Sequence, residues 1–355
     1  MAAESLAADI SLLGDAEGAD TAALHLPETG EWVRNPRGQK LHLRSTWPEG
    51  EPAAFVLSLH GYGAHCSRPT HRLVAEELAK LGVAYATVDF HGHGRSEGPR
   101  GLVTDPSLLL QDALCAALAY FGDGDVECAV TRPVVKSAAS AASVPLFLLG
   151  HSMGGGTALV LATLLAHGPD EALLGTLGSL SGFATLRSSF AGAMLLCPVV
   201  DMGVSSSVAA FAVATLAYWA PGGSVPVCLM DENASNESVW AGPRYRAYIE
   251  ADGYPGNPGG LSFGGNIQFR TLRTVLDLSA LAIRRLPLVT FPFLVMHDTE
   301  GDIVVPGASS KRLVEEAPAE SKTHAEVPGG LHDLLANRPV EVTEGLCAWL
   351  TSRLG

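Results

Sequence analysis

The sequence predicts an α/β fold, with a mostly parallel central sheet flanked by helices and an inserted cap. Short apolar segments alternate with helix-like segments after residue 50, and one long segment interrupts that alternation. Hydrophobic residues make up 47% and charged residues 17% of the 355 residues, which supplies enough apolar side chains for a large core. We therefore expect a folded α/β unit rather than a disordered chain.

Six short segments are the expected strands. Most are rich in aliphatic, β-branched or aromatic residues, as buried parallel strands are. They cover residues 54–59, 83–89, 145–149, 191–197, 291–296 and, as the weakest of the six, 322–327. Between them lie helix-like segments at 69–81, 106–121 and 153–166, and Asp105 is a suitable N-cap for the second of these. Active sites in such sheets lie at the carboxyl ends of the strands, so the loops after these segments are the place to search.

The same pattern divides the chain into four parts. We expect a partly disordered N-terminal extension at 1–37, the first part of the core at 38–197, the cap at 198–275 and the second part of the core at 276–355. A long surface loop is predicted at 121–144. The apolar centre of the cap, 208–220, is shorter than the roughly 20 residues of a membrane span. This centre therefore predicts a buried or interfacial helix.

Charge and cysteine usage restrict the partners and the compartment. The formal net charge of -14 disfavours nucleic-acid binding and electrostatic docking to anionic lipid. Any membrane contact is then apolar and peripheral, through the cap. The six cysteines show no CxxC spacing and predict free thiols, and the acidic N-terminus does not resemble a signal peptide. We expect a cytoplasmic protein with peripheral membrane contact, and no pattern indicates an oligomeric state.

Ser152 is the strongest candidate nucleophile. It lies in the motif GHSMG at 150–154, a G-x-S-x-G match that follows an expected strand and runs into an apolar helix. A strand-turn-helix elbow of this kind exposes a strained serine and requires small neighbours. Ser96 lies in a second match, GRSEG at 94–98, but the Pro that follows it at position 99 disfavours a direct start of such a helix.

A serine nucleophile needs a base and an orienting acid, which follow it along the chain in the order acid, then histidine, in the α/β-hydrolase fold. His332 lies in a Gly-rich loop after the last expected strand and is the favoured base. His324 is its rival but lies inside that strand. A serine at the elbow also argues against epoxide hydrolases and haloalkane dehalogenases, which use an Asp nucleophile.

The acid is expected in the loop after the strand at 291–296. This loop offers Asp298, Glu300 and Asp302. We favour Asp302, because Gly-Asp followed by a β-branched run is typical of the end of this loop. Asp298 lies close to the strand end, and solvated turn carboxylates are the alternative interpretation for the two others.

The oxyanion hole is expected to use two backbone amides. One belongs to Met153, directly after the nucleophile. The other belongs to Tyr62 in the sequence HGYG at 60–63, after the first expected strand. His91 and His93 lie in a nearby loop, but no carboxylate or Cys shares their spacing, so we expect no metal and no cofactor.

Together these motifs resemble the monoacylglycerol lipases and their plant relatives, including lysophospholipase-like and caffeoylshikimate-esterase-like hydrolases. The matching segments are 59–63 (LHGYG), 89–98 (DFHGHGRSEG), 150–155 (GHSMGG), 291–306 and 330–335 (GLHDLL). The resemblance implies that Ser96 has no catalytic role, that Arg68 binds substrate, and that the cap is an apolar lid over an acyl tunnel. The chain departs from the family pattern at Ala64, where a Glu usually holds glycerol, and at Leu335, where a polar residue is common.

We therefore expect a serine carboxylic-ester hydrolase for a lipid-like ester such as a monoacylglycerol or a lysophospholipid. Esterases for small or phenolic esters, peptidases and C–C hydrolases use the same triad and stay open as alternatives. A non-catalytic lipid-binding protein on this scaffold is a further alternative, although such a protein should have lost a member of the triad.

Overall fold

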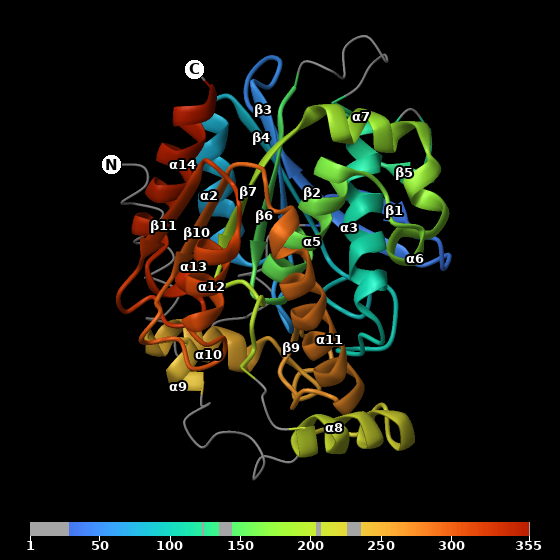
Figure 1. Cartoon of the computed structure of the whole chain (residues 1–355), viewed down its shortest axis with the longest axis vertical. Coiled ribbons are helices and arrows are strands. Elements are labelled where there is room, and N and C mark those ends of the chain that lie inside the picture. The colour runs from blue at the N-terminus through green and yellow to red at the C-terminus, as the bar shows by residue number, and fades with distance from the viewer. Residues whose placement is uncertain (1–27, 123, 135–143, 204–206, 226–235, 355) are drawn as a thin grey trace.

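The computed structural model describes residues 28–122, 124–134, 144–203, 207–225 and 236–354. Its centre is a nine-stranded sheet in the order β11-β10-β7-β6-β3-β4-β2-β1-β5 (Figure 1). The strands are β1 (Trp32–Arg34), β2 (Lys40–Thr46), β3 (Ala54–Leu59), β4 (Val83–Val88), β5 (Cys128–Ala129), β6 (Leu146–His151), β7 (Phe190–Leu196), β10 (Phe293–His297) and β11 (Lys322–Glu326). The pairs from β4 to β11 are parallel, whereas β2, β1 and β5 pair antiparallel.

All six predicted strands are present, and the mostly parallel α/β class is confirmed. The sequence does not predict β1, β2 and β5. These strands are short or mixed in polarity, and β2 has only its residues 41–43 buried, so they lack the continuous apolar pattern of a central strand. The strand β1 lies inside the range 1–37, of which residues 1–27 are outside the described part of the chain. The predicted loop at 121–144 contains β5, and its residues 123 and 135–143 are likewise not described.

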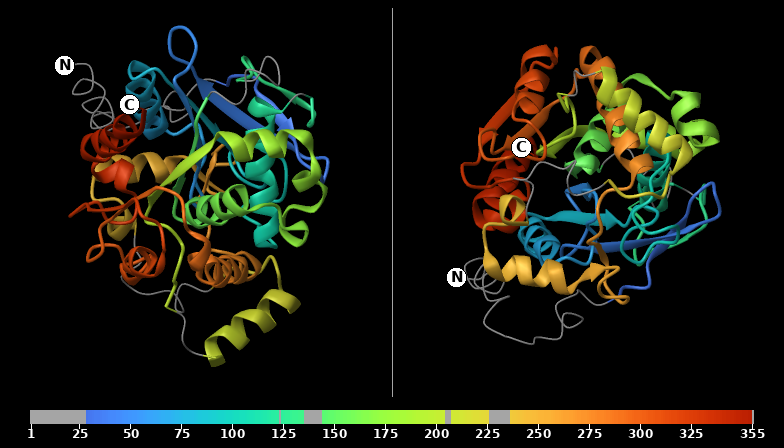
Figure 2. Two further views of the ribbon diagram at one scale, coloured as in Figure 1. Left: turned by 45° about the horizontal axis from the view of Figure 1, so that its top comes forward. Right: turned by 90° about the horizontal axis from the view of Figure 1, so that it is seen from below.

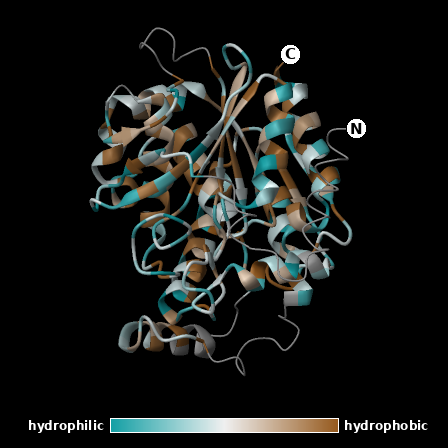
Figure 3. Ribbon diagram, turned by 180° about the vertical axis from the view of Figure 1, so that it is seen from behind, coloured by the Kyte–Doolittle hydropathy of each residue, from teal (hydrophilic) through white to brown (hydrophobic). Residues whose placement is uncertain are grey.

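Helices cover both faces of the sheet (Figures 1 and 2). On one face lie α3 (Pro106–Phe121), α5 (Met153–His167), α6 (Glu171–Leu174), α7 (Ser181–Ser189), α11 (Phe269–Arg285) and α12 (Ala308–Glu316). The other face is covered by α2 (Pro69–Lys80), α13 (Leu334–Asn337) and α14 (Pro339–Leu354). Each face has its own apolar core. The strands between the two helical layers consist largely of hydrophobic residues, drawn in brown (Figure 3).

The cap follows β7 and lies beyond the carboxyl ends of the parallel strands (Figure 1). Its described elements are α8 (Ser207–Trp219), α9 (Asn236–Val239), α10 (Pro243–Ala251), β8 (Gly253–Tyr254) and β9 (Ser262–Phe263). The boundary predicted at residue 275 falls inside α11, one continuous helix that packs against both α5 of the core and α8 of the cap. The predicted apolar helix of the cap corresponds to α8. Within the described ranges, no helix combines the length and the apolar composition needed to cross a bilayer.

Candidate active site

Ser152 occupies a tight elbow between β6 and α5. Its backbone has φ 55° and ψ -119°, a conformation that costs energy for a residue with a side chain. The glycines around it are required by contact: a Cβ on Gly150 would lie 2.3 Å from the Gly154 carbonyl oxygen, and one on Gly154 would lie 2.2 Å from the Leu59 carbonyl oxygen. The elbow is therefore a strained turn that only this pattern of small residues permits.

Ser152, His332 and Asp302 lie in one hydrogen-bonded row. The Ser152 hydroxyl lies 2.9 Å from His332 Nε2, and His332 Nδ1 lies 2.8 Å from Asp302 Oδ2. The carboxylate only accepts, so Nδ1 carries the proton and Nε2 is free to accept from the serine. Burial alone would raise the pKa of Asp302, but the two neighbouring imidazoles and backbone amides hold it far below its usual value. The arrangement presents an ionised carboxylate, an imidazole and a serine hydroxyl in sequence.

The other two acids of the predicted loop have different positions. Asp298 accepts hydrogen bonds from the amides of Gly301 (2.9 Å) and Leu331 (3.0 Å), so it links the loop of Asp302 to the loop of His332. Glu300 is exposed. The structure therefore brings Asp302 to His332 and gives Asp298 a bracing contact.

His324 and Ser96 lie away from the row. His324 is on the edge strand β11, where its Nε2 lies 4.0 Å from Glu326. Ser96 is buried, donates to the Asp89 carbonyl oxygen (2.6 Å) and accepts from the His42 amide (2.8 Å). Ser96 thus braces the turn at 89–98 against β2.

The loop that carries Tyr62 lies against Ser152. A Cβ on Gly61 would lie 2.9 Å from His151 Nδ1 and 3.1 Å from Ser152 Cβ, so this loop and the elbow are in close contact. The Tyr62 hydroxyl donates to the Gly101 carbonyl oxygen at 3.2 Å and anchors the side chain away from the elbow. Met153 is the first residue of α5, and an amide at that position has no partner within its own helix.

Buried histidines hold the surrounding loops in place. His60 Nδ1 donates to the Gly61 carbonyl oxygen at 2.7 Å, and its Nε2 accepts from the Phe90 amide at 3.0 Å. Burial lowers the pKa of His60 well below its usual value, so the ring is neutral. His91 and His93 do not converge on one point: His91 bonds Asp112 at 2.6 Å, and His93 bonds the His91 carbonyl oxygen at 3.0 Å.

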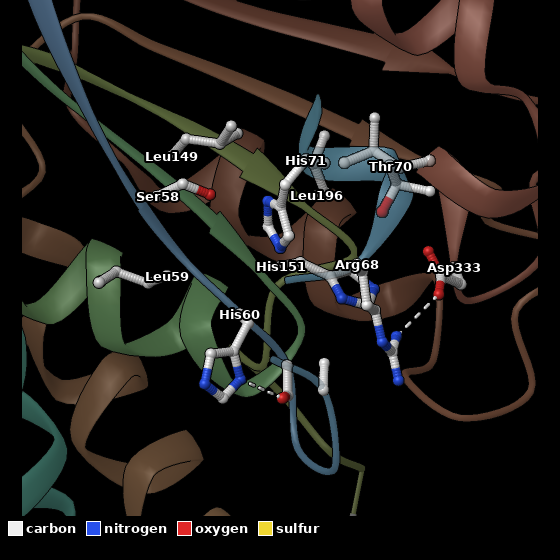
Figure 4. A pocket seen from close by; sticks show the side chains of 13 residues that line it. Ser58, Leu59, His60, Arg68, Thr70, His71, Leu149, His151, Leu196 and Asp333 are labelled. Carbon is white, nitrogen blue, oxygen red and sulfur yellow. Dashed lines mark hydrogen bonds and ion pairs between the residues drawn. The ribbon is translucent and has the colours of Figure 1, made fainter. Parts of the chain in front are cut away.

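A small cavity of about 30 Å³ lies beside the elbow and is lined by Gly61, Ala64, Arg68, His151 and Asp333, among others (Figure 4). This volume has room for about one water molecule. Burial, reinforced by His332, lowers the pKa of His151 to about 4, so this ring is also neutral near pH 7.

Arg68 and Asp333 form a buried pair at this cavity. Arg68 donates to Asp333 Oδ2 and to Ser262 Oγ, each at 3.4 Å, and Trp240 of the cap donates its indole N–H to Asp333 at 2.9 Å. The sequence predicts Arg68 as a site residue but not Asp333 or Trp240. The position of Asp333 directly after the base was the available signal, whereas nothing in the sequence pairs Trp240 with it.

The sheet order, the elbow and the hydrogen-bonded row define the class of protein: a serine hydrolase with the α/β-hydrolase fold. The chain belongs to the family described as serine aminopeptidase, S33, whose model matches residues 50–339.

Relatives agree with this assignment. The chain is 28% identical over 312 residues to a monoacylglycerol lipase of Mycolicibacterium smegmatis, covering 86% of this chain and 91% of that protein. It is 27% identical over 316 residues to the human monoglyceride lipase, covering 88% and 86%. The chain is thus a monoacylglycerol lipase-like serine hydrolase, as its motifs predicted.

Solved structures support the same fold. A monoacylglycerol lipase from Paleococcus ferrophilus has a TM-score of 0.60 at 20% identity and covers 88% of this chain and 98% of its own. A soluble variant of the Saccharomyces cerevisiae monoglyceride lipase, in complex with a substrate analog, has a TM-score of 0.63 at 18% identity and covers 93% and 97%.

Proposed function

We propose that the protein hydrolyses the carboxylic-ester bond of a lipid-like substrate, such as a monoacylglycerol or a lysophospholipid. In this proposal Ser152 is the nucleophile, His332 the general base and Asp302 the acid that orients it. The observation that carries the proposal is the continuous row of hydrogen bonds from Ser152 to Asp302 at a strained elbow. Relatives named monoacylglycerol and monoglyceride lipases support the substrate class.

The reaction proceeds through an acyl-enzyme. His332 Nε2 takes the proton of the Ser152 hydroxyl as its oxygen attacks the ester carbonyl carbon, and Asp302 stabilises the resulting imidazolium. The tetrahedral intermediate then breaks its C–O bond, and His332 gives the proton to the leaving alcohol. A water molecule, deprotonated by His332, attacks the acyl-enzyme. The bond between the acyl carbon and Ser152 Oγ then breaks, His332 returns the proton to that oxygen, and the fatty acid leaves.

The amides of Tyr62 and Met153 are proposed to hold the oxyanion. Developing charge on the carbonyl oxygen is stabilised by N–H groups that are already oriented before the reaction. The close approach of Gly61 to Ser152 supports Tyr62, and the position of Met153 at the first turn of α5 supports the second donor. The helix dipole of α5 adds to this stabilisation because its positive end lies at the same point.

The alcohol side of the substrate is proposed to contact Arg68. A small or phenolic ester is the second candidate substrate, because Ala64 offers no carboxylate for a glycerol head and the adjoining cavity has only about 30 Å³. A lipid-like ester carries a long acyl chain and a small or phenolic ester does not, so the preference for acyl-chain length distinguishes the two candidate substrates.

Labelling with a fluorophosphonate probe tests the proposal. Wild-type protein should be labelled and Ser152→Ala should not, and the wild type should hydrolyse long-chain monoacylglycerols or lysophospholipids faster than short-chain esters. Labelling with turnover of only small or phenolic esters would favour the second candidate. Wild-type protein that is not labelled, or labelling that persists in Ser152→Ala, would overturn the proposed nucleophile.

We further propose that α8 contacts apolar membrane surface. Leu216, Tyr218 and Trp219 at its end are 38%, 75% and 78% exposed, although all three are large and hydrophobic. Aromatic residues of this kind favour the boundary between lipid and water. Wild-type protein should float with neutral liposomes, and a variant with Tyr218→Ser and Trp219→Ser should float less. Wild-type protein that stays wholly in the aqueous fraction would contradict this contact.

A further inference from the structure

A second imidazole contacts the carboxylate of the proposed triad. His297, the last residue of β10, is fully buried, and its Nε2 lies 3.0 Å from Asp302 Oδ2. His332 Nδ1 lies 2.8 Å from the same oxygen. Because a carboxylate oxygen only accepts hydrogen bonds, both rings donate an N–H to it.

The other nitrogen of His297 contacts a serine. Its Nδ1 lies 2.7 Å from Ser310 Oγ, at a fully buried position of α12. An imidazole that donates only through Nε2 accepts at Nδ1, where a serine hydroxyl is a suitable donor. Two serine–imidazole pairs therefore meet at one carboxylate oxygen: Ser152 with His332, and Ser310 with His297.

The second oxygen of Asp302 is held by the backbone. Its Oδ1 accepts from the amides of Val304 and Val305 at 2.8 and 2.9 Å. With two donors on each oxygen, rotation of the carboxylate would break several hydrogen bonds at once. His297 is the second side-chain donor to Oδ2, beside His332.

We propose that His297 is a positioning residue for the reaction, which holds Asp302 in line with His332 and draws negative charge away from the oxygen that both rings share. The inference rests on the proposed triad. A donor that shares the charge of a carboxylate weakens the effect of that carboxylate on its other partner. Without the Nε2–H of His297, Asp302 would therefore keep His332 protonated up to a higher pH. The neutral base would then be less populated on the acid side of the activity profile.

Other titratable groups face this cluster and stay constant in the test. Cys197 has its sulfur within 4.8 Å of the nearest atoms of His297 and Asp302, and burial raises the pKa of its thiol well above the usual value, so it carries no charge near pH 7. The remaining titratable neighbours lie in the loop of the acid, on β11 and around the base: Asp298, His324, Glu326, His151, Arg68 and Asp333.

Two amide variants of His297 separate positioning from packing. Gln can place an amide N–H near the position of Nε2, whereas the shorter Asn reaches only the position of Nδ1. His297→Gln therefore keeps a donor to Asp302, and His297→Asn loses it. The readout is the rate of fluorophosphonate labelling of Ser152 as a function of pH, with the thermal unfolding midpoint measured beside it. This probe needs no knowledge of the natural substrate.

We expect His297→Asn to label about tenfold more slowly at pH 7, since a hydrogen bond to a charged group is lost. The acid limb of its profile of labelling rate against pH should move to higher pH by about half a unit. His297→Gln should be labelled at a rate within about threefold of wild type, and its acid limb should lie close to the pH of the wild-type limb.

Identical acid limbs in wild type and His297→Asn would overturn the inference even if the rate falls, because a packing defect alone does not change the protonation of His332. Equal losses of labelling rate in the Asn and Gln variants would overturn it as well.

If His297→Asn does not fold, Ser310→Ala serves instead. This variant keeps the ring of His297, weakens Nε2–H as a donor and should move the acid limb to higher pH by a smaller amount. An unchanged profile in that variant would then overturn the inference. The proposed function fails separately, when wild-type protein is not labelled at Ser152.

Discussion

The helices α5 and α8 both lack Asp, Glu, Lys and Arg, yet the protein uses them in opposite ways. Residues 153–165 of α5 are all buried between the sheet, α3 and α11. The helix α8 packs mainly against α11 and leaves Tyr218 and Trp219 three-quarters exposed. An uncharged sequence therefore permits burial without imposing it. The surrounding elements decide whether the apolar surface supports the elbow at Ser152 or faces outward.

The largest expected effect lies at the start of α5. Ser152→Ala should reduce ester hydrolysis by about 10⁴-fold or more, since loss of a nucleophile removes the covalent route. The thermal unfolding midpoint should change little, because the variant removes one small hydroxyl and a single hydrogen bond. Hydrolysis rates and calorimetry measure the two quantities.

Ser96→Ala is the matched control, because Ser96 lies in the same sequence motif but braces a turn. That variant should lose stability and keep fluorophosphonate labelling. Wild-type rates in Ser152→Ala, or loss of labelling in a folded Ser96→Ala, would contradict the assignment.

Acid should lower the stability of the protein through three buried histidines: His151 at the end of β6, His93 in the loop after β4, and His71 on α2. Burial is the main cause that lowers the pKa of His151 and His93 to about 4, and the same cause lowers that of His71 to about 3. The unfolded rings take up protons near pH 6.5, so the unfolded state binds more protons between that pH and about 4. The free energy of unfolding should therefore fall as the pH drops through this window, by about 2 kcal/mol per ring at pH 5. Urea unfolding at pH 7 and pH 5 measures it, and equal values would contradict the prediction.

Substitutions in α5 and α8 should also differ in how much they lower the unfolding free energy. Gly154→Ala places a Cβ 2.2 Å from the Leu59 carbonyl oxygen, so the backbone of α5 or β3 must shift. We expect a loss of about 2 kcal/mol or more in unfolding free energy. Leu216→Ala, a change on the exposed side of α8, should cost less than about 1 kcal/mol. Similar losses in the two variants, measured by urea unfolding, would show that α8 is packed as tightly as α5.

The smallest effect is expected at the end of α8. The double variant Tyr218→Ser and Trp219→Ser should change the unfolding free energy by no more than about 0.5 kcal/mol, because both side chains are mostly exposed. Hydrolysis of a water-soluble short-chain ester should also be unchanged. A marked drop in either quantity would mean that these aromatic rings stabilise the enzyme itself.

Much of the fold and part of the site could be predicted from sequence. The central strands have continuous apolar runs, and the elbow has a motif whose glycines are required by steric contact, so both leave a local signal. The antiparallel strands β1 and β2 have no such signal because only part of each is buried. His297 was not predicted as a partner of Asp302, since its role depends on the direction of a side chain at the strand end.

The sequence by itself determined the class of protein, the elbow at Ser152 and the loops that hold its partners, because these depend on local patterns and on chain order. Only the tertiary structure decided which acid faces His332, which carboxylate pairs with Arg68, and which apolar helix is buried. Asp302 and Asp298 lie in the same loop, and only the folded loop turns one toward the base and the other toward backbone amides. Arg68 and Asp333 are 265 positions apart in the sequence, so packing of separate elements is what creates their contact.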